Sequence, residues 1–282
     1  MTDTRRFGDS NLHTAVDNAL QSFTGVLGCY AKNLTTGEEF GYRADEVMPT
    51  ASVIKVPIMA ELYRQVEEEM VDLEQRVTIE ADDWTGGTGV LKTFMPGLQP
   101  TIMDLCRLMI IVSDNVATAR LVNILGKDQI NQSLREWGLS TTELRYNMQL
   151  GGDIRQYAVS STRDLGRMYE LISTDGFLTA ESCAAMRDHL GRQQHLEQIP
   201  RGLPFNQFAS EIGVEQPVRV MNKIGNYMGV RVDAAIIASP KSTFVLVTMN
   251  EGSSDHGFAI DQEGNILNGR IGRIFFDAWG SE

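Results

Sequence analysis

Ser52-Val53-Ile54-Lys55 places a hydroxyl nucleophile and an amine base three residues apart, where an apolar helical pattern over residues 52–68 begins. Residues at this spacing share one face of a helix, so the Lys55 amine can reach the Ser52 hydroxyl. A serine hydroxyl becomes a good nucleophile only when a base takes its proton, and a lysine serves as that base when burial lowers its pKa. By itself, this spacing is more often a buried helix start with a capping serine.

Two further motifs follow in order, Ser113-Asp114-Asn115 after an apolar helical pattern and Lys223-Ile224-Gly225 in a predicted strand. The ordered triple is typical of enzymes that form an acyl-enzyme on serine. Ser113 is expected to relay a proton to the leaving group. Asn115 is expected to hydrogen-bond a substrate amide and the Lys55 side chain, whereas Asp114 is expected to bond local backbone.

The third motif predicts the other side of the site. Lys223 is expected to bind a substrate carboxylate and to lower the proton affinity of its surroundings. Gly225 allows a ligand to approach the backbone closely. The backbone N–H groups of Ser52 and Asn226 would then form an oxyanion hole.

Hydrophobic periodicity predicts an α+β fold with the sheet at the two ends of the chain and helices between them. We expect an antiparallel sheet of about five strands flanked by terminal helices, with an all-helical lobe inserted. The predicted helices are 11–23, 52–68, 101–112, 115–125, 128–137, 162–173, 180–191 and 266–279, and the predicted strands are 26–31, 39–42, 218–221, 230–238 and 244–248. We interpret residues 1–282 as one domain, with an α/β lobe over about 11–50 and 205–282 and a helical lobe over about 51–204. The glycine-rich run 83–89 predicts a loop at the mouth of the cleft between them.

Composition excludes several classes of partner. The net charge of −12 argues against nucleic acid and anionic membranes, whose phosphates would be repelled. No stretch approaches the roughly 20 apolar residues of a membrane span. Three widely spaced cysteines among apolar residues predict buried thiols, and four histidines without metal-binding spacing predict no metal. Residues 1–8 have no apolar signal-peptide core, so we expect a cytoplasmic protein, or a periplasmic or secreted one whose export signal was removed.

The motifs and their surroundings resemble the class A β-lactamase branch of the penicillin-recognising serine hydrolases over roughly residues 12–280. Thr88-Gly89-Val90-Leu91 resembles this family's approach to its S-D-N loop, and Val116-Ala117-Thr118 resembles the helix after it. Ser161-Thr162-Arg163-Asp164-Leu165 is similar to the helix start that follows the family's active-site loop. The resemblance implies the fold of that family and Ser52 as the nucleophile.

Two positions depart from the family pattern. Ile224 stands where the family has a hydroxyl residue that donates to the carboxylate of a β-lactam, so that grip is weakened unless Asn226, Tyr227 or Arg231 supplies it. The family's glutamate that activates the deacylating water is missing from residues 144–157. Asn147 aligns with that glutamate, and Asp153 and Gln156 are the other polar candidates for the deacylation role.

These observations predict a serine hydrolase that cleaves an amide or lactam through an acyl-enzyme on Ser52, with β-lactamase-type hydrolysis expected first. An esterase or D-amino-acid amidase or carboxypeptidase on the same residues is the first alternative. A penicillin-binding or sensing domain that acylates without turnover is the second. The expected partner is a small-molecule acyl substrate (a β-lactam, ester or peptide-like amide), and no cofactor is expected. We expect a monomer.

Overall fold

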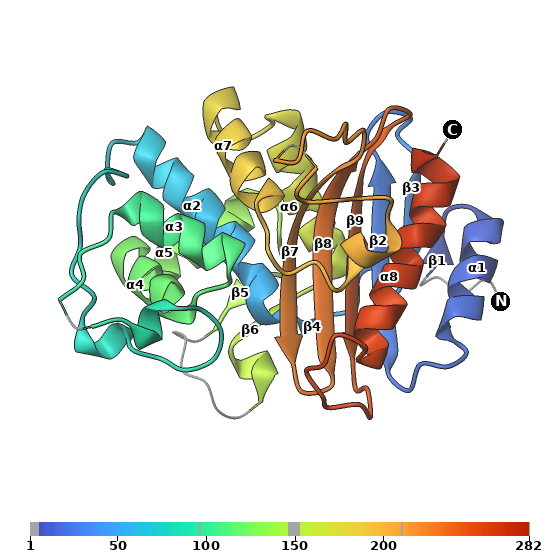
Figure 1. Cartoon of the computed structure of the whole chain (residues 1–282), viewed down its shortest axis with the longest axis horizontal. Coiled ribbons are helices and arrows are strands. Elements are labelled where there is room, and N and C mark those ends of the chain that lie inside the picture. Colours follow the sequence, from blue (N-terminus) through green and yellow to red (C-terminus); the bar gives the residue numbers. More distant parts are fainter. Residues whose placement is uncertain (1–5, 96, 146–152, 210, 282) are drawn as a thin grey trace.

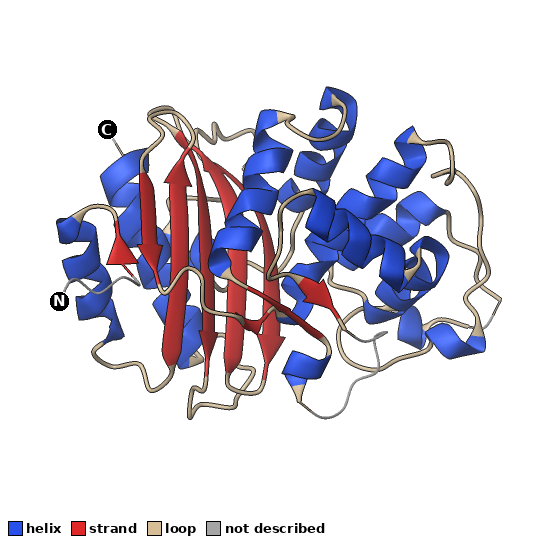
Figure 2. Ribbon diagram, turned by 180° about the vertical axis from the view of Figure 1, so that it is seen from behind, coloured by secondary structure: helices blue, strands red, loops and turns tan. Residues whose placement is uncertain are grey.

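A six-stranded antiparallel sheet forms the centre of the computed structural model, which describes residues 6–95, 97–145, 153–209 and 211–281. The strand order is β1-β3-β2-β9-β8-β7. The strands are β1 (Arg6–Phe7), β2 (Val26–Asn33), β3 (Glu39–Tyr42), β7 (Arg219–Tyr227), β8 (Val230–Ala238) and β9 (Thr243–Glu251). The N-terminal β2 pairs with the C-terminal β9, from Val26↔Glu251 to Asn33↔Phe244. The predicted pairing of the two ends of the chain is therefore confirmed, and the strands lie side by side in Figures 1 and 2.

The sheet differs from the prediction at both of its edges. The sixth strand, β1, consists of two residues that pair with β3, and two residues are too few to show an alternating pattern. At the opposite edge β7 runs from Arg219 to Tyr227, so the strand predicted over 218–221 and the strand predicted for Lys223-Ile224-Gly225 are one continuous strand. Its polar residues Asn222, Lys223 and Asn226 interrupt the apolar alternation, although the first two are fully buried.

Helices cover both faces of the sheet. Figure 1 shows α8 and α1 in front of the sheet, and Figure 2 shows α6 on the opposite face. The helices are α1 (Ser10–Leu20), α2 (Lys55–Glu67), α3 (Ile102–Ile111), α4 (Asn115–Leu125), α5 (Lys127–Glu136), α6 (Thr162–Thr174), α7 (Ala180–Gly191) and α8 (Glu263–Phe275). They match the predicted helices closely, except that α8 ends at Phe275 and one π turn follows it. A small second sheet, β4 (Met48–Pro49), β6 (Ala158–Ser160) and β5 (Glu143–Leu144), was not predicted.

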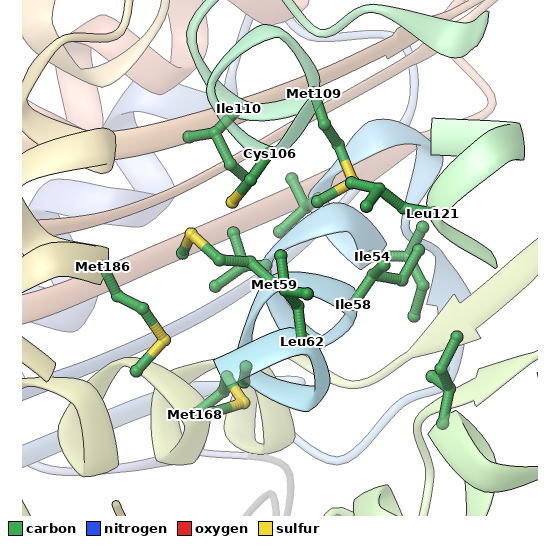
Figure 3. Packing of buried hydrophobic residues seen from close by; sticks show 14 of the residues in the cluster. Ile54, Ile58, Met59, Leu62, Cys106, Met109, Ile110, Leu121, Met168 and Met186 are labelled. Atoms are coloured by element: carbon green, nitrogen blue, oxygen red, sulfur yellow. The ribbon is translucent and has the colours of Figure 1, made fainter. Parts of the chain in front are cut away.

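Two hydrophobic clusters occupy the two faces of the main sheet. Along β8, Val232, Ala234 and Ile236 face the helical cluster, while Ala235 and Ile237 face the cluster under α1 and α8. This alternation follows from the two-residue period of a strand. The helical cluster surrounds α2, and Figure 3 shows some of its members: Ile54, Ile58, Met59, Leu62, Cys106, Met109, Ile110, Leu121, Met168 and Met186.

The three cysteines are free and buried, as predicted. Within the described ranges, no helix combines the length and apolar character needed to cross a bilayer. Burial on all sides of α2 has a consequence for the site, because the polar residues at its start are enclosed with it. Lys55, its first residue, has no exposed surface.

Candidate active site

Ser52 lies in a short 3₁₀ turn, Ala51–Ile54, immediately before α2. The preceding Ala51 has φ of 43°, a left-handed conformation that side chains with a Cβ seldom adopt. Such local strain is stored where the surrounding structure fixes an otherwise unfavourable backbone, and it is concentrated at functional sites. Ser52 is partly exposed although its neighbours in the turn are buried. A buried turn thus presents one accessible hydroxyl.

Lys55 is held by the turn between α3 and α4. Its Nζ donates to the Ser113 carbonyl oxygen at 2.8 Å, to Ser113 Oγ at 3.0 Å and to Asn115 Oδ1 at 2.7 Å. Burial, and secondarily the nearby charge of Lys223, holds the pKa of Lys55 well below its ordinary value. In the described part of the chain, its hydrogen bonds go to these acceptors and not to Ser52, which lies on the preceding turn of backbone.

The Ser113-Asp114-Asn115 turn is fixed by its own residues and by the glycine-rich loop. Ser113 has φ of 55°, a second left-handed residue at the site. Asp114 caps α4 through the Ala117 N–H and accepts the N–H groups of Val90 and Leu91. The bond to the Ala117 N–H is the local one that the sequence predicted, whereas Val90 and Leu91 lie 24 and 23 residues earlier in the chain.

The glycine-rich loop lies directly against this turn. Thr88 Oγ1 donates to the Ser113 carbonyl oxygen at 2.7 Å, and Asn115 Nδ2 donates to the Gly86 carbonyl oxygen at 2.9 Å. Asn115 is thereby oriented with its amide oxygen toward Lys55 and its amide nitrogen toward the loop. The predicted contact between Asn115 and Lys55 is present.

Strand β7 forms the wall facing Ser52. A Cβ on Gly225 would lie 2.8 Å from the Ser52 nitrogen and 2.7 Å from the Thr50 carbonyl oxygen, closer than atoms can pack. Only glycine therefore allows β7 to approach the Ser52 N–H this closely. Asn226 follows Gly225 on β7, and its backbone N–H is the second oxyanion-hole donor that the sequence predicts.

Lys223 contributes a second buried amine. Its Nζ donates to the Ile224 carbonyl oxygen at 2.9 Å, and the side chain has no exposed surface. Burial lowers the pKa of Lys223 to about 7, although the charges of Asp233 and Glu197 oppose this shift. The charge of Lys223 contributes to the lowered pKa of Lys55, because like charges repel.

Arg231 and Asn226, which the sequence offered as alternative carboxylate donors, bond to other protein groups. The Arg231 guanidinium is buried and donates to Asn265 Oδ1 and to the carbonyl oxygens of Tyr227, Val230 and Gly257. Asn226 Oδ1 accepts from Gln198 Nε2 at 2.7 Å, and Asn226 Nδ2 lies 3.3 Å from Glu197 Oε1. Ile224 is buried and offers no donor.

Sequence reasoning missed the segment 193–199, which brings His195 and Glu197 to the site. His195 hydrogen-bonds to the backbone of Val112, and burial and the charge of Lys223 lower its pKa. The missed signal lies in β8, where Arg231 and Asp233 stand inside an otherwise apolar run. A fully buried charged side chain needs hydrogen-bond partners. One partner of Asp233 is the backbone N–H of Ile199, which belongs to this segment.

Two of the three deacylation candidates, Asp153 and Gln156, lie in a short turn after residue 152. Asn147 lies outside the described residues. Asp153 is exposed and accepts the N–H of Arg155, which caps a short 3₁₀ turn, and Gln156 is exposed in the same turn. The described residues contain no cluster of three or more histidine, cysteine or acidic side chains arranged to hold a metal ion.

Comparisons with known proteins show the family and the fold that the chain shares. A family model described as a beta-lactamase enzyme family matches residues 11–279. The beta-lactamase regulatory protein BlaB of Streptomyces cacaoi is 32% identical over 128 residues, which are 44% of this chain and 41% of that protein. The chain spans 41%, 48% and 61% of the length of three curated relatives that it matches.

Two solved structures are similar over almost their whole length. A beta-lactamase from Sphaerobacter thermophilus is 28% identical with a TM-score of 0.84, covering 95% of this chain and 97% of that one. A mutant of PBP-A, solved as an acyl-enzyme complex with penicillin G, is 25% identical with a TM-score of 0.81, covering 95% of this chain and 96% of that one.

Proposed function

The chain belongs to the beta-lactamase enzyme family, and from that premise we propose that it is a serine hydrolase that cleaves β-lactams or related amides through an acyl-enzyme on Ser52. The observation that carries the proposal is the fully buried Lys55, held by Ser113 and Asn115 one helical turn from an accessible serine hydroxyl. Burial holds the pKa of Lys55 well below its ordinary value, which favours the unprotonated amine that a general base requires.

In the acylation step, Lys55 takes the proton of Ser52 as the hydroxyl oxygen attacks the carbonyl carbon. The N–H groups of Ser52 and Asn226 stabilise the oxyanion, and the tight approach of Gly225 supports this role. Collapse of the tetrahedral intermediate breaks the carbon–nitrogen bond. Ser113, which already accepts a hydrogen bond from Lys55, passes a proton from that lysine to the leaving nitrogen.

Lys223 has a different part in this mechanism. Its charge lowers the pKa of Lys55, which favours the free amine that the attack requires. With its own pKa near 7, Lys223 can also exchange protons with the leaving-group side at neutral pH. The chain's own residues suffice for these steps.

The proposal is tested by incubating the protein with a chromogenic cephalosporin, a short-chain p-nitrophenyl ester and a fluorescent penicillin. Turnover of the cephalosporin, together with a transient adduct on Ser52 by intact mass spectrometry, supports β-lactam hydrolysis. Ester turnover alone supports an esterase. If Ser52→Ala left all three signals unchanged, the assignment of the nucleophile would be wrong.

A second candidate is a penicillin-binding domain that acylates without turnover. The exposed position of Asp153 and Gln156, with Asp153 committed to a cap, favours it, because a deacylation base must reach a water beside the acyl-enzyme. The PBP-A mutant solved as an acyl-enzyme shows that a similar protein can be trapped in this state. A stable adduct of one equivalent of fluorescent penicillin would decide for this candidate.

A further inference from the structure

The segment 193–199 between α7 and the following turn is fixed at both of its ends. Gln193 is buried, donates to the Ile110 carbonyl oxygen and accepts the N–H groups of Gln194 and His195. Asp233 on β8 is fully buried and accepts the Ile199 N–H at 2.9 Å. Because hydrogen bonds hold both ends of the segment, the backbone between them is fixed in position. The side chains that this segment directs toward the site are therefore preorganised.

The carboxylate of Glu197 lies next to the end of β7 that carries Asn226; we call this part of β7, with Lys223 and the neighbouring Arg231 of β8, the oxyanion wall. Its Oε1 lies 3.3 Å from Nδ2 of Asn226, the residue whose backbone N–H is the proposed second oxyanion donor. The position of Asn226 is fixed in turn by Gln198, whose amide also accepts from Asn268 on α8. The charge of Glu197 acts on both cations of this wall, since it raises the pKa of Lys223 and of Arg231 against the effect of burial.

The groups that could bind an anion at this wall are already paired within the protein. Arg231 makes four hydrogen bonds to protein oxygens and lies under the ring of Phe258. Lys223 Nζ donates to the Ile224 carbonyl oxygen, and the charges of Glu197 and Asp233 raise the pKa of this amine against the effect of burial. Ile224 has no donor. A substrate carboxylate would have to displace these bonds and approach Glu197, and like charges in a partly buried site repel strongly.

We propose that Glu197 is a specificity-determining residue that makes this site select acyl donors whose leaving-group side is neutral or cationic and reject those with a carboxylate there. Uncharged esters, amides and lactams are the substrate class. The inference rests on the proposed function, because selection is expressed when Ser52 is acylated. Glu197 acts here on the choice of substrate and takes no part in the covalent steps.

The test compares benzylpenicillin with its methyl ester, two lactams that differ in one carboxylate. Rates of Ser52 acylation are measured by intact mass spectrometry for the wild type and for Glu197→Gln, which keeps an oxygen for Asn226 and removes the charge. We expect Glu197→Gln to raise the rate with benzylpenicillin at least tenfold and to change the rate with the methyl ester less than twofold. Comparing the two proteins cancels the different intrinsic reactivity of the two lactams.

Two further variants serve as controls. Glu181→Gln removes the same charge from the exposed start of α7, about 15 Å along the helix from its end at Gly191, and should leave both rates unchanged. Glu197→Asp keeps the charge and should keep the preference for the ester. If the ratio of the two rates in Glu197→Gln stayed within twofold of the wild-type ratio, the inference would be overturned while the proposed function stood.

A binding measurement tests the inference in the case where no acylation of Ser52 is observed. If neither lactam acylates any of these proteins, the proposed function fails, and calorimetry in the Ser52→Ala background still decides the inference. Benzylpenicillin should then bind Ser52→Ala/Glu197→Gln at least tenfold more tightly than Ser52→Ala, with the methyl ester binding both alike. Equal affinities of benzylpenicillin for the two proteins would overturn it.

Discussion

Gly225→Ala tests the contact that defines the proposed oxyanion hole. The new Cβ would lie 2.8 Å from the Ser52 nitrogen, 2.7 Å from the Thr50 carbonyl oxygen and 2.9 Å from the Ala51 Cβ. All three partners belong to the turn that carries the nucleophile, and none is the flexible end of a side chain. To reach an ordinary contact of 3.4 Å, β7 and this turn must separate by about 0.6 Å.

This displacement should affect catalysis more than stability. Loss of one oxyanion donor lowers kcat by about 10²- to 10³-fold, because the donor must meet the developing charge at a defined distance. Overpacking by one methyl group costs about 1–3 kcal/mol of unfolding free energy. In a chain of this length that corresponds to a fall in Tm of a few degrees.

The assay is the acylation rate of Ser52 by the methyl ester of benzylpenicillin, followed by intact mass spectrometry and measured beside thermal unfolding. Gly191→Ala is the matched control, because its added Cβ would meet only Met221 Cγ, at 3.6 Å. It should keep both the rate and the Tm of the wild type. An acylation rate for Gly225→Ala within threefold of the wild-type rate would refute the assignment of this wall as the oxyanion hole.

Three other predictions concern the buried charges of the site. Lys55→Met should lower the acylation rate by about 10²- to 10⁴-fold through loss of the general base, whereas the exposed Lys241→Met should not; comparable rates for the two variants would contradict the role of Lys55. Burial lowers the pKa of Lys223 from 10.5 in the unfolded chain to about 7 in the folded protein. Between about pH 7 and pH 10.5 this lysine is therefore protonated in the unfolded chain and neutral in the folded protein. The free energy of unfolding consequently rises with pH across this range. Lys223→Met should reduce that rise by about 2–3 kcal/mol between pH 7.5 and 9.5 in urea unfolding, and an unchanged slope would argue against the burial of this amine. Asp114→Ala leaves the N–H groups of Val90, Leu91 and Ala117 without their acceptor and should cost about 3 kcal/mol, against less than about 1 kcal/mol for the exposed Asp128→Ala.

Local patterns were sufficient to predict most of the elements. The helices from α2 to α7 carry apolar residues at helical spacing, and their observed ends differ from the predicted ends by a few residues. The strands at the two ends of the chain could be paired by the argument that neither group forms a whole sheet alone. The two-residue strand β1 was missed, because it is too short to show the apolar alternation on which the prediction depended.

Some residues of the candidate site could be predicted from the sequence, and others could not. The order and spacing of three short motifs named Ser52, Lys55, Ser113, Asn115 and Lys223, and the fold brings Lys55 into hydrogen-bonding contact with Ser113 and Asn115. The roles of these residues stay predictions until they are tested by mutation. Neither Glu197 nor Asp233 belongs to any of these motifs, and the only local signal was the charge of Asp233 inside the apolar run of β8.

By itself, then, the sequence determined the family, the order of helices and strands and the identity of the proposed nucleophile, because each of these depends on neighbours along the chain. Tertiary structure alone decided the electrostatic surroundings of the site. Asp233 lies ten residues beyond Lys223 and Glu197 lies 26 residues before it, yet both charges act on that lysine after folding. A charge influences whatever lies near it in space, so the proton affinity of the buried amines and the selectivity proposed for Glu197 arise only when the segments pack together.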